Sequence, residues 1–350
     1  MLPASGNFLR FVRRRATRVE KRLLGESGLS VSVLGLGCWP LGGGVGWEDQ
    51  DERDSLATIH AALDHGINFF DTAEAYNEGH SEELLGKALL GRRDKALIAT
   101  KILPAHAEPN TLRAHCEASL RRLQTDYIDL YQVHWPITDY SVEEAFATLR
   151  ALQAEGKIRA IGVSNHGPQQ LAQALATGTQ IASNQVCYNL LCRAVEAEII
   201  PLCRRYNIGV ITYMALMHGL LAGKYATPDD VPPFRARSRH FSRTRPGTRH
   251  GEEGAEAETF QALAHIRHIA EDLGVSMAHL SIAWIMARPG VSCVLVGSRT
   301  PAQVRDNVAA TQLRLSPETI AELDQATEAL RLKLGPNADY WQGGEQTRVR

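Results

Sequence analysis

The chain has 350 residues, of which 44% are hydrophobic and 22% are charged, and its formal net charge is −1. This composition is typical of a globular protein with a large core, and the charge gives no reason to expect nucleic acid or an acidic membrane as a partner. No apolar run approaches the roughly 18 residues that a membrane-spanning helix needs, so membrane insertion is not expected.

The N-terminus differs from the rest of the chain. Residues 1–19 contain no acidic residue and carry five arginines, and their apolar stretch is too short and broken for a signal peptide. We interpret residues 1–20 as a basic, disordered extension, with a targeting arm or an arm for anionic surfaces as the alternative. Residues 21–332 are predicted to form one domain, which begins with a small β-hairpin whose turn residues lie within 24–32.

Beyond the hairpin, strand-like and helix-like segments alternate. Short apolar runs are expected as buried strands at 33–38, near 69, and at 96–101, 128–134, 160–164, 183–188, 209–214 and 293–297. Helices are expected at 52–65, 81–90, 111–123, 142–155, 168–176, 195–206, 257–273, 276–287, 301–310 and 317–330. Apolar strands that alternate with helices specify a parallel sheet. We therefore predict an α/β fold, a (β/α)8 TIM barrel with an N-terminal β-hairpin and extra C-terminal helices; an open doubly wound sheet is the alternative.

Two segments break this alternation. Residues 226–255 are rich in Arg, Pro, Gly and charge and are too polar for a core, which predicts a mobile loop over or beside the functional site. The tail, residues 333–350, carries Tyr340 and Trp341 where a frayed end would need neither. We expect this tail near the mouth of the barrel.

Reactive side chains stand where several predicted strands end, and in (β/α)8 barrels the chemistry lies at the carboxyl ends of the strands. Taken singly, a histidine there is as well explained by packing and a lysine by solvent exposure. Together, a phenol, an ammonium group, a carboxylate and an imidazole suggest a proton-transfer device. A neighbouring lysine lowers the pKa of a phenol, and a carboxylate holds that lysine charged. The four candidates are Asp71, Tyr76, Lys101 and His134.

These positions carry a family resemblance. Asp71-x4-Tyr76, Thr100-Lys101 and Val133-His134-Trp135-Pro136 resemble the catalytic tetrad segments of the aldo-keto reductases, and the match runs from about residue 21 to residue 330. The resemblance implies reduction of a small-molecule carbonyl by hydride transfer, with Tyr76 as the proton donor and Lys101, Asp71 and His134 in support.

The resemblance also implies a nicotinamide cofactor. Gly162-Val163-Ser164-Asn165 and Asn184-Gln185 resemble the carboxamide-binding positions, and later segments resemble a stacking tyrosine, a pyrophosphate loop and an adenosine-phosphate segment. The expected cofactor-binding residues are Gly37, Cys38, Trp39, Ser164, Asn165, Gln185, Tyr213, Met214, Leu216, Gly219, Leu220, Lys224, Gly297, Ser298, Arg299, Gln303 and Asn307.

The cofactor preference follows from the last of these segments. Ser298 and Arg299 precede a predicted helix whose free N–H groups favour an anion, and a guanidinium suits a 2′-phosphate. We therefore expect NADPH/NADP+, with NADH as the alternative. Met214-Ala215 departs from the Ser-Pro that usually follows the stacking tyrosine, which puts one pyrophosphate contact in doubt.

Other chemistries find little support. The sequence has no H-E-x-x-H motif, which would predict a metal site. Its six cysteines form no C-x-x-C pair, which favours free thiols in a reducing, cytoplasmic setting. Two alternatives keep the barrel: a nicotinamide-binding, redox-sensing subunit of a membrane channel, and a phosphate-dependent isomerase or aldolase with Lys101 as a Schiff base. The substrate is expected to be an aldehyde, a ketone or a sugar carbonyl, in a pocket walled by Trp39, Trp135, Tyr340 and Trp341.

Overall fold

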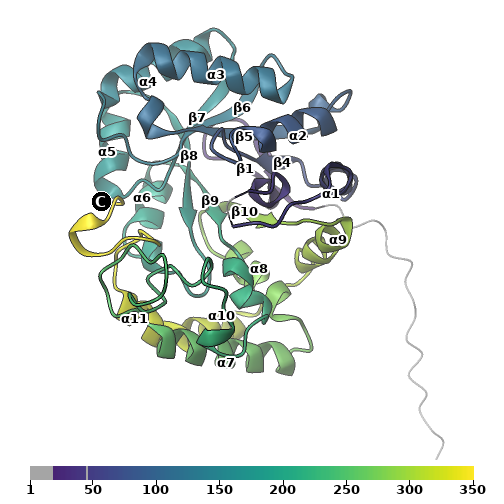
Figure 1. Cartoon of the computed structure of the whole chain (residues 1–350), viewed down its shortest axis with the longest axis vertical. Helices are drawn as coiled ribbons and strands as arrows, with labels where there is room; N and C mark the ends of the chain where they lie inside the picture. The colour runs from purple at the N-terminus through teal and green to yellow at the C-terminus, as the bar shows by residue number, and fades with distance from the viewer. Residues whose placement is uncertain (1–18, 45) are drawn as a thin grey trace, which may run out of the picture.

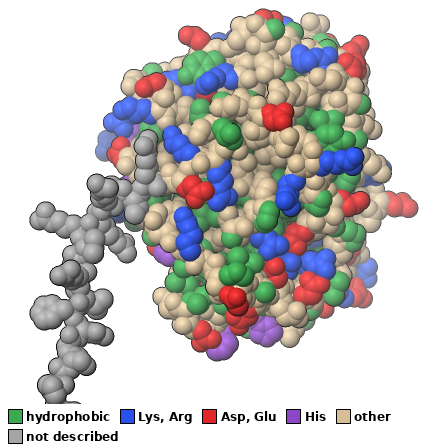
Figure 2. Space-filling view, turned by 180° about the vertical axis from the view of Figure 1, so that it is seen from behind, with side chains coloured by type: hydrophobic (Ala, Val, Ile, Leu, Met, Phe, Trp, Pro, Cys, Tyr) green, Lys and Arg blue, Asp and Glu red, His purple; other side chains and the backbone are tan. Residues whose placement is uncertain are grey.

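The computed structural model describes residues 19–44 and 46–350. The predicted basic extension falls almost wholly on residues 1–18, which lie outside the described residues. Within the described part, no helix combines the length and the apolar character that crossing a membrane requires. On the face drawn in Figure 2, Lys and Arg side chains lie among Asp and Glu side chains, in keeping with the net charge of −1.

Eight parallel strands close into a barrel, in the order β10-β3-β4-β5-β6-β7-β8-β9. Strands and helices alternate, and the helices lie outside the strands (Figure 1). The strands are β3 (Leu34–Gly37), β4 (Phe69–Asp71), β5 (Leu97–Ile102), β6 (Ile128–Val133), β7 (Ile158–Ser164), β8 (Ile181–Cys187), β9 (Gly209–Tyr213) and β10 (Val291–Gly297). The predicted (β/α)8 barrel is confirmed, because the pairing of β10 with β3 closes the sheet and excludes the open alternative.

The helices follow the predicted segments closely. Several begin at the side-chain caps that favour helix starts, such as Ser141, Ser276 and Thr300, whose hydroxyls accept a hydrogen bond from the first turn. The helices are α1 (Glu52–Asp64), α2 (His80–Ala88), α3 (Pro109–Leu123), α4 (Val142–Ala154), α5 (Pro168–Ala176), α6 (Ile199–Arg205), α7 (Glu256–Asp272), α8 (Met277–Met286), α9 (Pro301–Ala310), α10 (Pro317–Ala326) and α11 (Glu328–Leu334).

Two helix predictions need correction. The segment predicted as a helix over 195–206 is α-helical only from Ile199, after a short 3₁₀ turn at 194–196. Pro201 accounts for this, because proline is tolerated only in the first turn of a helix. The predicted helix 317–330 is divided into α10 and α11 at Thr327.

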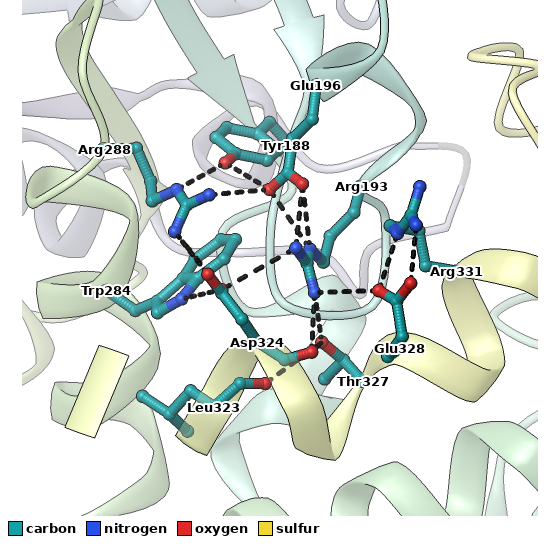
Figure 3. Close-up of polar contacts among 10 residues, drawn as sticks. All are labelled: Tyr188, Arg193, Glu196, Trp284, Arg288, Leu323, Asp324, Thr327, Glu328 and Arg331. Atoms are coloured by element: carbon teal, nitrogen blue, oxygen red, sulfur yellow. Dashed lines mark hydrogen bonds and ion pairs between the residues drawn. The ribbon is translucent and has the colours of Figure 1, made fainter. Parts of the chain in front are cut away.

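Thr327 belongs to a polar network that joins the C-terminal helices to the barrel (Figure 3). Arg193, in the connection after β8, donates to the backbone oxygen of Asp324 at 2.8 Å and to Thr327 Oγ1 at 3.0 Å. The same guanidinium pairs with Glu196 at 2.8 Å. Because Arg193 is almost fully buried, these partners satisfy a charge that would otherwise be costly, and they fix the end of α10.

The N-terminal hairpin, β1 (Lys21–Leu23) and β2 (Ser30–Ser32), closes the amino end of the barrel. Leu24, Leu29 and Val31 join the apolar cluster inside the barrel, which includes Phe69 at the start of β4. Leu24 lies directly against Gly209, the first residue of β9, where a side chain would collide with it. The hairpin, residues 21–32, thus forms a plug at the amino end of the barrel. The carboxyl end of the strands is the open end.

Residues 226–255 pack against the C-terminal part of the chain. Phe241 is fully buried, which corrects the prediction that this segment is too polar to enter a core. Polar residues of this segment can be buried because they find partners. Arg239, for example, pairs with Glu252 at 2.9 Å and donates to the carbonyl oxygens of Leu334 and Asn337 at 2.6 and 2.8 Å. Charged groups satisfy one another while the few apolar side chains turn inward; the mobility of the segment stays a prediction.

Candidate active site

The four residues of the proposed tetrad meet at the carboxyl end of the barrel. Asp71 is the last residue of β4, Lys101 is the fifth of β5, and His134 directly follows β6, so three adjacent strands supply them. Lys101 Nζ lies 2.6 Å from Asp71 Oδ1 and 3.2 Å from the Tyr76 hydroxyl. The ring of His134 stands edge-on to that of Tyr76, with 5.9 Å between the ring centroids.

The fold fixes this arrangement through the connection that follows β4. The backbone nitrogen of Thr72 donates to the carbonyl oxygen of Ala99 at 2.8 Å, and the Thr72 carbonyl oxygen accepts a third hydrogen bond from Lys101 Nζ, at 2.8 Å. Gln185, on β8 across the barrel, donates to Asp71 Oδ2 at 2.7 Å. Both carboxylate oxygens of Asp71 are therefore occupied, so the aspartate can orient Lys101 but is not itself available to a substrate.

Burial governs the electrostatics of the site. Burial alone would lower the pKa of Lys101, but Asp71 and the Tyr76 hydroxyl more than offset this, and the net pKa is raised. Lys101 therefore stays positively charged at neutral pH. For Tyr76, burial of the hydroxyl raises the pKa above its usual value although Lys101 acts in the opposite direction. The expectation that lysine lowers this pKa is confirmed for its own contribution, but the effect of burial is larger.

His134 has the properties of a neutral hydrogen-bonding group. Burial, with the nearby charge of Lys101, holds its pKa well below the usual range. Its Nδ1 is buried and has no hydrogen-bond partner among the described residues. A buried polar atom without a partner is costly, and such atoms gather at sites that receive a ligand. The arrangement provides a protonated phenol, a cation beside it and a neutral imidazole that face one another.

The residues predicted to hold a carboxamide lie next to this group. Asn165 donates to the backbone oxygen of His134 at 3.1 Å and accepts a hydrogen bond of 2.6 Å from the Tyr213 hydroxyl. Ser164 donates to the backbone oxygen of Gln185 at 2.9 Å. Asn165 adopts a left-handed backbone (φ 59°), which asparagine tolerates better than most residues. Amide and hydroxyl groups from β7, β8 and β9 therefore converge beside the tetrad.

The predicted pyrophosphate loop follows β9. Its backbone turns through left-handed conformations from Met217 to Gly219, and a side chain at Gly219 would collide with Lys224. Met214 is also left-handed (φ 61°), and its carbonyl oxygen accepts a hydrogen bond from Asn189 at 2.9 Å. Leu220 is buried, Leu216 is partly buried, and Lys224 is exposed. The loop therefore offers a tightly turned backbone with one exposed cation, which suits an anion.

The segment at the end of β10 makes a contact that sequence reasoning missed. Arg299 donates to Gln50 Oε1 at 2.6 Å and to the backbone oxygen of Glu48 at 2.9 Å, so it closes onto the connection after β3. Its Nη1 has no hydrogen bond within the described chain, and the nearest carboxylate oxygen, on Glu48, is 3.9 Å away. Because its bonded partners are neutral, the guanidinium keeps its charge for an anion.

The neighbours of Arg299 complete this end of the site. Gln303 accepts a hydrogen bond from the Arg299 backbone at 2.7 Å, and Asn307 donates to Ser298 Oγ at 3.0 Å, both from α9. Gly37 pairs with Asp71 on one side and Gly297 on the other. Gly37, Cys38 and Trp39 therefore lie between the tetrad and the proposed cofactor segment.

Aromatic side chains surround the tetrad at the mouth. The ring of Trp39 stacks on Tyr76 at 6.0 Å, and Trp47 meets Trp39 edge-on at 5.8 Å. The ring centroid of His218 lies 6.3 Å from that of Trp39 and 6.4 Å from that of Trp341, so His218 links the predicted pyrophosphate loop with the C-terminal tail. His218 was missed, although its place directly before Gly219 was a usable signal.

The other three residues predicted to wall the substrate pocket differ in their surroundings. Tyr340 packs edge-on against Trp341 at 4.4 Å and is itself almost fully buried, so it supports Trp341. Trp135 is covered by the guanidinium of Arg348 at 3.6 Å. The tail is fixed by an ion pair of 2.8 Å between Arg348 and the buried Asp339, and the chain end lies beside α5 (Figure 1). Trp341 is therefore the tail residue that joins the ring cluster at the mouth, through its contact with His218.

A family model described as "Aldo/keto reductase family" matches residues 33–328. The chain belongs to the aldo/keto reductase family. Relatives include "Aldo-keto reductase YhdN" of Bacillus subtilis, which is 37% identical over 82% of this chain and 87% of its own length. The "NADH-specific methylglyoxal reductase" of Escherichia coli is 33% identical, with 89% of this chain and 99% of the relative covered.

Two further comparisons bear on function. An aldo/keto reductase of Klebsiella pneumoniae, solved in complex with NADP and acetate, matches 95% of this chain and 99% of its own with a TM-score of 0.69 and 30% identity. A "Probable voltage-gated potassium channel subunit beta" of Arabidopsis thaliana is 31% identical over 89% of this chain and 97% of its own length. Membership of the family makes the chain an oxidoreductase, while relatives of different activity leave its substrate open.

Proposed function

We propose that this aldo/keto reductase uses NADPH to reduce aldehyde or ketone carbonyls, sugar-like ones included, to alcohols. The observation that carries the proposal is the position of Lys101 Nζ between Asp71 Oδ1 and the Tyr76 hydroxyl, at 2.6 and 3.2 Å. It makes Tyr76 an acid whose anion, once the proton has left, faces a fixed positive charge.

When bound, the cofactor supplies the hydride that the carbonyl carbon accepts. The protein residues handle the oxygen. Tyr76 is protonated at neutral pH and donates its proton to the carbonyl oxygen, while Lys101 stabilises the phenolate that is left. Asp71 holds Lys101 charged, and the neutral ring of His134, which stands edge-on to that of Tyr76, orients the oxygen. The rings of Trp39, Trp47 and Trp341 limit the access of water, which strengthens each of these interactions.

The residues present suit NADPH. Arg299 Nη1 makes no hydrogen bond among the described residues, and only the exposed Glu48 carboxylate lies near it, at 3.9 Å. Arg299 also precedes the N-terminus of α9, so it can pair with a 2′-phosphate. Asn165, Gln185 and Tyr213 supply amide groups and a ring for the nicotinamide end. The NADH-specific relative from E. coli makes the preference a question for measurement.

The test is NADPH oxidation, followed by absorbance with a panel of aldehydes and ketones, for the native chain and for Tyr76→Phe. We expect turnover by the native chain and its loss in Tyr76→Phe, with the dissociation constant of NADPH changed less than about threefold. Full activity in Tyr76→Phe would rule out Tyr76 as the acid.

A second candidate function is that of a redox-sensing subunit with little turnover. The channel-subunit relative favours it, because it covers nearly the whole chain. The same assay separates the two: tight NADPH binding with negligible turnover across the panel would support the sensor and contradict the reductase. The barrel isomerase or aldolase is disfavoured, since Lys101 is fully buried and its raised pKa keeps it protonated, whereas a Schiff base needs a neutral amine.

A further inference from the structure

A second group of polar side chains lies beside the tetrad, outside the roles described above. Glu74 follows Asp71 in the connection after β4, His106 ends the short 3₁₀ helix η3 (Pro104–His106), and His115 lies in α3. His106 Nδ1 is 2.9 Å from Glu74 Oε1, and His115 Nδ1 is 2.8 Å from Glu74 Oε2. The two imidazole rings are stacked, with 3.8 Å between centroids.

We propose that Glu74, His106 and His115 form a binding site for a divalent transition-metal ion of the Zn²⁺ class. One ligand atom from each residue lies within 4.8 Å of the others. Zinc binds imidazole nitrogen and carboxylate oxygen at about 2.0–2.2 Å, so a shared ion requires neighbouring ligand atoms to lie roughly 3–3.5 Å apart. Binding one ion therefore requires side-chain rotations that bring the three ligand atoms closer together.

The charge of the cluster favours a cation. Glu74 is almost fully buried, with its side chain 5% exposed, and no lysine or arginine pairs with it among the described residues. Within the described part of the chain, its oxygens accept hydrogen bonds only from the two imidazoles and from the backbone nitrogen of Leu103, at 2.9 Å. A buried carboxylate without a permanent positive partner is costly, and a metal ion that displaces the imidazole protons supplies the missing charge.

The ligand types select the class of ion. Two nitrogen ligands and one carboxylate suit zinc, copper, nickel or iron, whereas magnesium and calcium prefer oxygen ligands. The side chains of His106 and His115 are 32% and 34% exposed, so an ion held there keeps open positions toward solvent. No sequence motif could indicate this set, because the histidines lie 32 and 41 residues from Glu74 along the chain.

An ion at this site would join two connections that serve the tetrad. Glu74 stands two residues before Tyr76, and its backbone nitrogen donates to the carbonyl oxygen of Lys101 at 3.4 Å. His106 and His115 belong to the chain that leaves β5 just after Lys101. Metal binding would therefore restrain the backbone on both sides of the contact between Lys101 and Tyr76.

The experiment is a calorimetric titration of the full chain with Zn²⁺, compared with His106→Gln and His115→Gln. Both rings are partly exposed, so circular dichroism is expected to confirm that the variants fold. Loss of a supporting residue around a metal site typically weakens binding 10–100-fold, so loss of a ligand should weaken it about 100-fold or more. The matched control is His279→Gln, which removes an imidazole 3.0 Å from Asp306 and should leave binding unchanged.

A Co²⁺ titration identifies the ligands independently of turnover and of the reductase proposal. We expect one ion per chain, with visible d–d bands and no thiolate charge-transfer band. If the native chain binds Zn²⁺ no more tightly than His115→Gln does, the proposal is overturned. The three residues would then form a hydrogen-bonded cluster only. A thiolate band would overturn it too, because it would place the ion at a cysteine.

Discussion

Replacement of Lys101 by methionine tests the centre of the proposed mechanism. The substitution keeps an unbranched side chain of similar length in a fully buried position and removes the charge beside Tyr76. It also leaves the buried carboxylate of Asp71 without its cation, which threatens stability. The double variant Lys101→Met/Asp71→Asn removes that unpaired charge and serves as the control for folding.

The magnitude follows from the contact of 3.2 Å between Lys101 Nζ and the Tyr76 hydroxyl. At an effective dielectric constant of about 20, a full charge pair at this distance is worth about 5 kcal/mol. When the proton is half transferred in the transition state, the Tyr76 oxygen carries about half a negative charge, whose interaction with Lys101 is worth about 2.5 kcal/mol. The barrier in the variant should therefore be higher by about 2.5 kcal/mol. That increase corresponds to roughly 10²-fold in kcat.

The assay is the steady-state oxidation of NADPH with a substrate found in the carbonyl panel, and the reverse oxidation of the alcohol followed against pH. Lys101 lowers the pKa of Tyr76 against the larger effect of burial, so its removal should raise that pKa further. Alcohol oxidation needs the phenolate, and its rise with pH should therefore move to higher pH in the variant. If kcat stays within about threefold in both variants and the pH profile does not move, Lys101 does not act on Tyr76.

Three further predictions address the cofactor, the plug and the response to acid. Arg299→Gln should raise the dissociation constant of NADPH at least about tenfold and leave that of NADH nearly unchanged, as measured by fluorescence titration; an equal loss for both would contradict a 2′-phosphate contact. Leu24→Ala should lower the free energy of unfolding by about 2–5 kcal/mol in a denaturant titration, because Leu24 is fully buried in the plug, and a loss below about 1 kcal/mol would argue against this role. Burial lowers the pKa of His166 from 6.5 to about 4, so as the pH falls the unfolded chain takes up this proton before the folded chain does. The free energy of unfolding should therefore be unaffected by His166 above pH 6.5 and should decrease as the pH drops toward 4. His166→Gln should remove about 3 kcal/mol of that acid-induced loss, and parallel stability curves for the native and variant chains would refute this.

The barrel could be predicted from the sequence because its signals are local. Apolar runs such as 128–134 and 160–164 are too short for helices, and capping residues such as Ser141 mark where the helices between them start. Once the strands are parallel, their carboxyl ends meet on one rim, and this alone brings Asp71 and Lys101 together. That these residues meet on one rim could therefore be predicted without coordinates, while their catalytic roles stay a prediction.

The contacts that escaped prediction join residues far apart in the chain. Arg299 and Gln50 are 249 residues apart, and neither position has a local pattern that names the other. At Thr327, where α10 gives way to α11, Arg193 donates a hydrogen bond from 134 residues away. The net pKa of Tyr76 escaped for a related reason: sequence shows which charges can meet, but the size of the burial effect depends on packing.

The closed order of the strands explains why one rim can hold both halves of the proposed chemistry. Strands β4, β5 and β6 and their connections supply the proposed proton-transfer residues, and β7 to β10 supply most of the proposed cofactor residues. Because β10 pairs with β3, the last cofactor segment returns beside the first strand, where Arg299 reaches Gln50 and Gly37 touches both β4 and β10. An open sheet would leave these segments at opposite edges. Closure of the barrel is thus the feature that would allow the proposed hydride donor and Tyr76 to act on one carbonyl group.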